Sequence, residues 1–127
     1  MRVEGQCHCG EISFSADIDP DQVTLCHCTD CQVFSGSAFR EVAVAPIESF
    51  VLRGSPKSYV KVAASGNRRA QMFCPTCGTP LYGTAPENAT SVTLRLGCVK
   101  QRADLRPSKQ VWQQSALPWV QSHALLV

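Results

Sequence analysis

Long apolar segments are missing from this sequence. No apolar run approaches the roughly 18 residues that a transmembrane helix needs. Residues 1–6 also lack the apolar core of a secretory signal peptide, so nothing in them directs the chain to an oxidising compartment. These two absences predict a cytoplasmic protein that has no membrane partner.

Helical patterns are scarce too, and no internal repeat or linker divides the chain. Short β-prone or alternating segments predict strands instead, and clusters of Gly, Pro, Asn and Asp separate them. A chain of 127 residues with 44% hydrophobic content predicts one domain over residues 1–127. The expected fold class is mainly β, with short strands and little helix. The predicted strands contain Ile12 and Phe14, residues 39–44, residues 59–62 and residues 92–96.

One short helix is predicted to begin near Thr29 and Asp30, either of which could be its N-cap. The positive N-terminal end of this helix would then favour thiolates in the neighbouring cysteines. Near the C-terminus, Trp112 and Trp119 are predicted to be packing anchors rather than a platform for a ligand. His123 has no motif around it.

Cysteine, in contrast, is abundant, and seven of the eight cysteines lie in three tight clusters. Disulfides are the alternative for an even number of cysteines, but Cys-X-Cys pairs are poorly placed to bridge each other. An iron–sulfur cluster is a third option, although the spacing matches no ferredoxin pattern. Zn²⁺ prefers thiolate ligands, so the sequence predicts two zinc ions per chain. The clusters are residues 7–9 (CHC), 26–31 (CHCTDC) and 74–77 (CPTC).

The spacing also predicts which cysteines share a metal. Cys74 and Cys77, followed by Gly78, are typical of a zinc-knuckle turn, which supplies two ligands and needs two more. Cys7 and Cys9 lie on the same side of an extended segment and can supply them. This closed four-sulfur site would connect the N-terminus to a distant part of the chain, which fits a structural role.

Cys26, Cys28 and Cys31 then form a second site with three ligands. Three sulfurs leave one coordination position of a tetrahedral zinc for water, hydroxide or an external thiol, as a catalytic site requires. Alternation turns His8 and His27 away from the sulfurs, so we expect them to form hydrogen bonds or to lie on the surface. Asp30 is either a helix cap or a group for proton transfer.

Cys98 stands outside the three clusters. We expect it to be a small buried residue in the strand after Leu96 and not a ligand. In the alternative it is a fourth ligand that closes the second site.

The charge balance argues against a nucleic-acid partner. The formal charge is +2, but seven thiolates and two Zn²⁺ would lower it by three, to about −1. The basic residues of the second half are predicted to form a solvated face, with an anion-binding pocket as the alternative. They are Arg68, Arg69, Arg95, Lys100, Arg102, Arg106 and Lys109.

Five segments carry a further signal: residues 5–14 (GQCHCGEISF), 26–32 (CHCTDCQ), 35–37 (SGS), 73–81 (FCPTCGTPL) and 115–119 (SALPW). Together they resemble the glutathione-dependent formaldehyde-activating enzyme family, which also includes centromere protein V. The resemblance runs nearly end to end, and three ordered cysteine motifs with matching flanks make it specific. It implies an Mss4-like fold, a structural zinc on Cys7, Cys9, Cys74 and Cys77, and a second zinc on Cys26, Cys28 and Cys31.

The resemblance also implies a function. The family chemistry is that of a carbon–sulfur lyase, written as glutathione adding to formaldehyde to give S-hydroxymethylglutathione. The expected partners are therefore a small-molecule thiol, glutathione above all, and a carbonyl substrate at the zinc held by Cys26, Cys28 and Cys31. The alternative is a non-enzymatic zinc-binding module that contacts proteins or nucleic acids.

Overall fold

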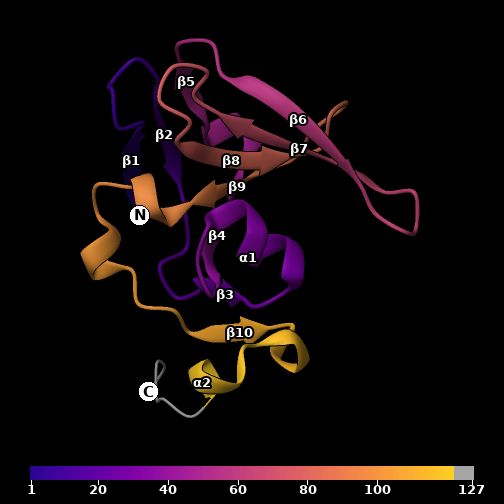
Figure 1. Ribbon diagram of the computed structural model, residues 1–127. Helices are drawn as coiled ribbons and strands as arrows, with labels where there is room; N and C mark the ends of the chain where they lie inside the picture. The colour runs from indigo at the N-terminus through magenta and orange to yellow at the C-terminus, as the bar shows by residue number, and fades with distance from the viewer. Residues whose placement is uncertain (122–127) are drawn as a thin grey trace.

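Ten short strands make up most of the fold in the computed structural model, which describes residues 1–121 (Figure 1). The strands are β1 (Arg2–Gln6), β2 (Ser13–Asp17), β3 (Thr24–Cys26), β4 (Arg40–Pro46), β5 (Val51–Arg53), β6 (Lys57–Val62), β7 (Arg68–Phe73), β8 (Pro80–Thr84), β9 (Ser91–Arg95) and β10 (Lys109–Val111). The helices are α1 (Thr29–Ser35) and α2 (Pro118–Gln121), with 3₁₀ turns η1 (Ile47–Ser49), η2 (Leu96–Cys98), η3 (Arg102–Asp104) and η4 (Gln113–Ser115).

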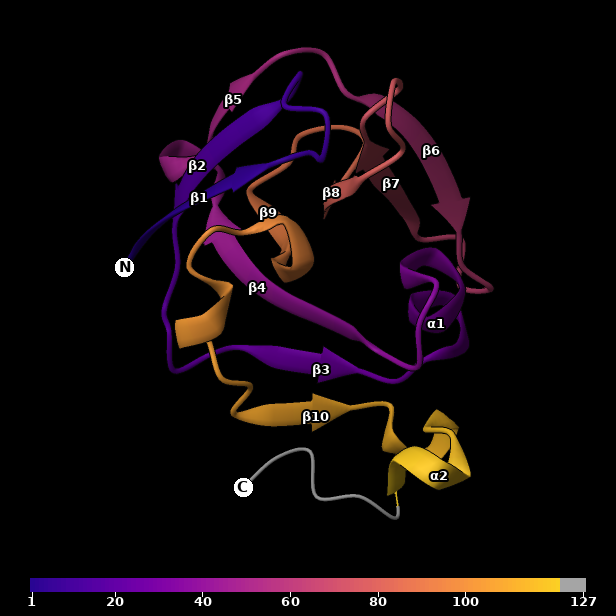
Figure 2. The same ribbon diagram turned by 60° about the vertical axis from the view of Figure 1, so that its left-hand side comes forward.

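The strands form two sheets. A three-stranded sheet has the order β1-β2-β5, and a seven-stranded sheet has the order β10-β3-β4-β9-β8-β7-β6. All neighbours are antiparallel except β10 and β3, which run parallel along one side of the molecule (Figure 2). The mainly β class predicted from the sequence is therefore confirmed.

Alternation along the strands builds one hydrophobic core from both sheets. Val3 of β1 and Phe14 of β2 point inward from the small sheet, and Val92 and Leu94 of β9 do so from the large one. Phe14 packs over Gly5, where an added Cβ would lie only 2.1 Å from the ring. The absence of a side chain at Gly5 therefore lets β1 approach the aromatic core.

The predicted strands are found, with small differences at their ends. Residues 39–44 correspond to β4, residues 59–62 to the end of β6, and residues 92–96 to β9, which stops one residue earlier. Ile12 precedes β2, which contains Phe14. Cys98 lies in the 3₁₀ turn η2, so its placement in a strand is wrong.

The short helix predicted near residue 29 is α1, but its cap differs from the prediction. Neither Thr29 nor Asp30 caps it, because both lie inside the first turn. The N-cap is Cys28, whose Sγ accepts a hydrogen bond from the N–H of Cys31. Sulfur therefore takes the position that an oxygen side chain usually occupies.

The prediction for the tryptophans is wrong. Trp112 and Trp119 expose 57% and 59% of their surface, so neither is a buried packing anchor. Trp112 has a positive φ of 56° at the start of η4, which turns the chain after β10. His123 lies outside the described residues.

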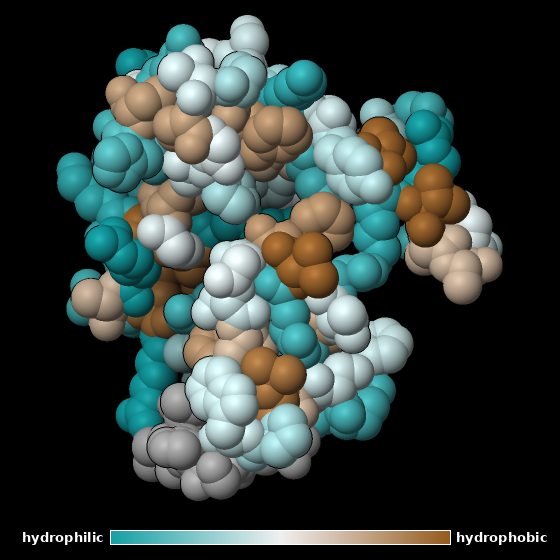
Figure 3. All heavy atoms as spheres, in the orientation of Figure 1, coloured by the Kyte–Doolittle hydropathy of each residue, from teal (hydrophilic) through white to brown (hydrophobic). Residues whose placement is uncertain are grey.

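The surface carries hydrophobic side chains near α1 and on the β6–β7 hairpin (Figure 3). The exposed ones on these elements include Val33, Tyr59 and Val62. No helix among residues 1–121 is long and apolar enough to cross a membrane.

Candidate metal centre and adjoining cavity

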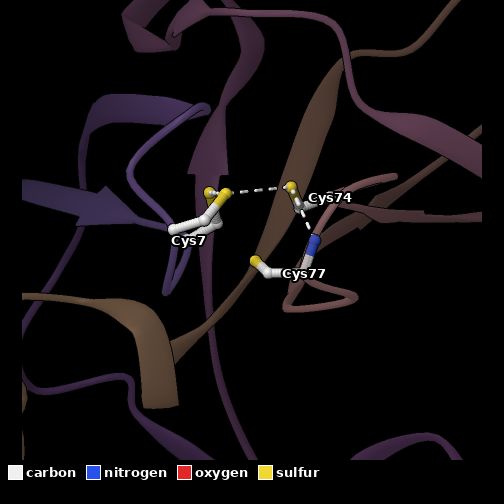
Figure 4. Close-up of side chains that lie close together, drawn as sticks. Cys7, Cys74 and Cys77 are labelled. Atoms are coloured by element: carbon white, nitrogen blue, oxygen red, sulfur yellow. Dashed lines mark hydrogen bonds between the residues drawn. The ribbon is translucent and has the colours of Figure 1, made fainter.

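Two hairpin turns, one from each sheet, bring four cysteines together. Cys7 and Cys9 lie in the turn between β1 and β2, and Cys74 and Cys77 lie in the turn between β7 and β8. All four sulfur atoms lie within 4.8 Å of one another. In Figure 4 the side chains of Cys7, Cys74 and Cys77 converge from these separate segments. The grouping is the one that the spacing predicts.

The two turns share the same local design. In the first, Cys7 Sγ accepts the N–H of Ile12 at 3.3 Å, and in the second, Cys74 Sγ accepts the N–H of Cys77 at 3.5 Å. Each turn contains a glycine with positive φ, 83° at Gly10 and 78° at Gly78. Glycine adopts this conformation without the steric cost that a Cβ brings. Backbone geometry thus aims the sulfurs before any metal binds.

The electrostatics of this group favour a bound cation. The Thr79 hydroxyl, together with the backbone N–H groups of Cys9 and Thr79, lowers the pKa of Cys77 to about 5. For Cys9, the N–H of Glu11 lowers the pKa, but burial and the neighbouring cysteines raise it to about 12. Four thiolates this close repel one another, and a dication removes the repulsion. Four sulfurs are also the donor set of closed zinc sites, so these residues fit the ion.

A second group forms where β3 meets α1. Cys26 ends β3, Cys28 caps the helix, and Cys31 lies in its first turn. The three sulfur atoms lie within 4.8 Å of one another, and no fourth Cys, His, Asp or Glu joins them among residues 1–121. This donor set fits a zinc ion with one coordination position left over.

The thiols of the second group differ in how readily they lose a proton. Burial raises the pKa of Cys28, but the N–H of Cys31 and the side chains of Cys31 and Cys26 outweigh it, so the pKa is lowered. Burial and the side chains of Cys26 and Cys28 raise the pKa of Cys31 to about 12, although the positive charge of Arg40 opposes the rise. Cys28 is therefore the first of this pair to become a thiolate.

The remaining candidates lie outside both sulfur groups. His8 is exposed, whereas His27 is fully buried with Nε2 2.7 Å from Oε1 of Gln110. Asp30 forms an ion pair with Lys61 of β6. Cys98 is half-buried, and its Sγ donates to the carbonyl oxygen of Arg95 at 3.2 Å. Burial raises the pKa of Cys98 to about 11.

A cavity of about 180 Å³ opens between the segments that carry the two groups. Phe34 of α1 lines it, as do Phe73 and Gly78, which flank Cys74 and Cys77. Arg40 and Arg95 also reach it, and Arg95 is only 7% exposed. Sequence reasoning assigned Arg95 to a solvated face, which is wrong. The one available signal was an arginine at the end of an apolar alternating strand.

A larger groove of about 680 Å³ lies elsewhere, on the outer face of the three-stranded sheet. Its polar rim includes Arg2, Arg53 and Lys100, and it contains none of the three cysteines of the second group. Cys7 of the first sulfur group and Cys98 line part of this groove.

Comparison with known proteins identifies the family of this chain. The family model of the glutathione-dependent formaldehyde-activating enzyme matches residues 2–115. A relative named as an uncharacterised lyase, from Schizosaccharomyces pombe, is 32% identical over 79 residues, which are 62% of this chain and 55% of that protein. The chain therefore spans about half the length of this curated relative.

A solved structure supports the fold alone. The crystal structure of a Rhodobacter sphaeroides protein has a TM-score of 0.65 at 18% identity, and the match covers 85% of this chain and 99% of the other. The family match spans both cysteine groups and all ten described strands. This chain therefore belongs to the glutathione-dependent formaldehyde-activating enzyme family.

Proposed function

We propose that this protein is a zinc-dependent carbon–sulfur lyase whose reaction joins glutathione, or a related thiol, to formaldehyde. The observation that carries the proposal is the group of Cys26, Cys28 and Cys31, which offers three sulfurs and no fourth ligand among residues 1–121. Family membership and the lyase name of the yeast relative support it. A non-enzymatic module would be expected to close both groups with four ligands.

The two sulfur groups have different roles in this proposal. Cys7, Cys9, Cys74 and Cys77 hold a structural zinc, and Cys26, Cys28 and Cys31 hold the second zinc at the reaction site. Bound there, zinc would lower the pKa of an incoming thiol and hold its sulfur near a small carbonyl compound.

The protein positions the cysteine ligands, and the proton that the reaction moves is exchanged with solvent. Helix α1 fixes Cys28 and Cys31 through the cap hydrogen bond. In the synthetic direction a bond forms between the thiol sulfur and the carbonyl carbon, and the carbonyl oxygen gains the proton that the thiol loses. Asp30 lies beside the group but is exposed and paired with Lys61, so we assign proton exchange to solvent. The lyase direction reverses the same steps.

Cobalt substitution tests the proposal. Adding glutathione at millimolar concentration, a range typical of substrates, should change the ligand-field spectrum of one of the two cobalt ions in the full chain. Cys28→Ser should abolish the change and leave the other cobalt bound. S-methylglutathione, which has no free thiol, is the matched control and should leave the spectrum unchanged. A ligand-field spectrum that glutathione leaves unchanged would contradict an open coordination position and remove the basis for the lyase proposal.

A further inference from the structure

Two arginine side chains converge in the cavity beside α1. Nη2 of Arg95 donates to Oε1 of Gln71 at 2.8 Å, and Nη1 of Arg40 donates to the same oxygen at 3.4 Å. The Arg40 guanidinium also lies 5.8 Å from the centre of the Phe34 ring. The neutral amide oxygen of Gln71 therefore accepts hydrogen bonds from both guanidinium groups.

Neither arginine has a carboxylate partner. Among residues 1–121, every ion pair involves other residues, and the Nε of Arg40 is buried without a hydrogen-bond acceptor. Burial, followed by the charge of Arg40, lowers the pKa of Arg95 to about 9. Buried charges in proteins are normally paired, because an uncompensated one is costly. No carboxylate among residues 1–121 therefore balances the two charges, and of the neighbouring groups only the thiolate forms of Cys31 and Cys98 would raise the pKa of Arg95.

The backbone is shaped to hold this arrangement. Gly83 of β8 lies opposite Gln71 in the register, and an added Cβ there would be 2.6 Å from Nη2 of Arg95. The guanidinium of Arg95 crosses β8 at the one position without a side chain. The cavity walls around it are largely apolar, and they include Tyr59, Met72 and Tyr82. A ligand with one anionic end and an aliphatic or peptide body matches these walls.

We propose that Arg40 and Arg95, positioned by Gln71, bind a carboxylate of the thiol co-substrate. This subsite rests on the proposed function, because it places a thiol-bearing peptide or amino acid with its sulfur toward Cys26, Cys28 and Cys31. The carboxylate supplies the missing negative charge and fills the unused donors of two guanidinium groups, which bind carboxylates in a forked geometry. The site thereby selects thiols that carry a free carboxylate over neutral thiols.

Calorimetric titration of the zinc-loaded full chain tests the subsite with S-methylglutathione and its diethyl ester as probes. Neither probe has a free thiol, so binding does not depend on an open metal position. We expect the free acid to bind about tenfold more tightly than the diester, as for a charged hydrogen-bonded pair worth roughly 1.4 kcal/mol. Arg40→Gln should remove this difference, and Arg40→Lys should keep part of it.

Two further variants keep the test informative if an Arg40 variant does not fold. Gln71→Glu introduces a carboxylate between the two arginines, so it should keep the fold and weaken binding of the free acid about tenfold or more. Arg53→Gln, on exposed β5, is the control and should leave binding unchanged. A purely structural role for the arginines predicts that Gln71→Glu has no effect on binding.

The outcomes separate this subsite from the reaction. Equal binding of acid and diester, or no binding of either, overturns the subsite even where glutathione changes the cobalt spectrum. Arginine-dependent binding of the free acid supports the subsite even where that spectrum does not respond to glutathione, and in that case the lyase proposal alone fails.

Discussion

Hydrogen bonds with the backbone distinguish three of the clustered cysteines from Cys98. Cys7, Cys28 and Cys74 each accept a backbone N–H at 3.3 to 3.5 Å, whereas Cys98 donates to a backbone carbonyl. An accepted hydrogen bond stabilises a thiolate, and a donated one requires a thiol. Neighbouring backbone N–H groups therefore orient the first three sulfurs for a metal, whereas burial raises the pKa of Cys98 to about 11 and keeps it a thiol.

Replacing Cys98 by Ser should leave the zinc content at the wild-type value. The side chain lies in neither sulfur group, and a hydroxyl can donate to the same carbonyl oxygen of Arg95. Metal analysis of the purified variant checks this, with Cys28→Ser as the control that loses one equivalent. Loss of one zinc from Cys98→Ser itself would make this residue a fourth ligand and close the second site.

At the scale of the element, α1 combines a cap and a ligand in one residue. The helix has only seven residues, too few to be stable by itself, so its N-terminal hydrogen bond matters. It ends at Gly36, which has a positive φ of 62°. The sulfur of Cys28 therefore helps to position Cys31 even before a metal binds.

A pair of substitutions separates capping from metal binding. Both Cys28→Ser and Cys28→Ala should lose the second metal, but Ser can accept the N–H of Cys31 and Ala cannot. In the metal-free state we expect the Ala variant to be less stable by about 1 kcal/mol. Denaturant unfolding of both variants measures the difference. Thr29→Ala serves as the control, and equal stability of the two Cys28 variants would show that the cap contributes nothing.

Across the whole molecule, the four-cysteine group connects the two sheets. Cys7 and Cys9 follow β1 of the small sheet, and Cys74 and Cys77 follow β7 of the large one. The three-cysteine group, by contrast, lies within residues 26–31. A metal in the first group constrains the packing of the sheets, whereas one in the second constrains a local turn.

Cys77→Ser should therefore lower the melting temperature much more than Cys31→Ser. A structural zinc contributes on the order of 10 kcal/mol in small peptides, which is comparable with the stability of a whole domain. Thermal unfolding with parallel zinc analysis checks the order of the two variants. Small and equal losses would contradict the assignment of a structural role to the first group.

Local spacing determined much of what the sequence predicts. Cysteines separated by one or two residues must lie close together in any fold, so each cluster could be read from the chain, and the need for four ligands paired residues 7–9 with residues 74–77. Alternation likewise predicted four strands, because side chains alternate between the faces of a sheet. The identity of the N-cap could not be predicted, because Cys28, Thr29 and Asp30 are consecutive and the sequence does not fix the residue at which the helix begins.

Only the tertiary structure decided what surrounds the sulfurs. Arg40, Gln71 and Arg95 come from β4, β7 and β9, and their meeting depends on the strand order and on the register that sets Gly83 between Gln71 and Thr93. The sequence by itself determined the ligand clusters and the β class, because both follow from neighbours along the chain. The tertiary structure decided which charges are buried together, because strands distant in sequence become neighbours only when the sheet forms.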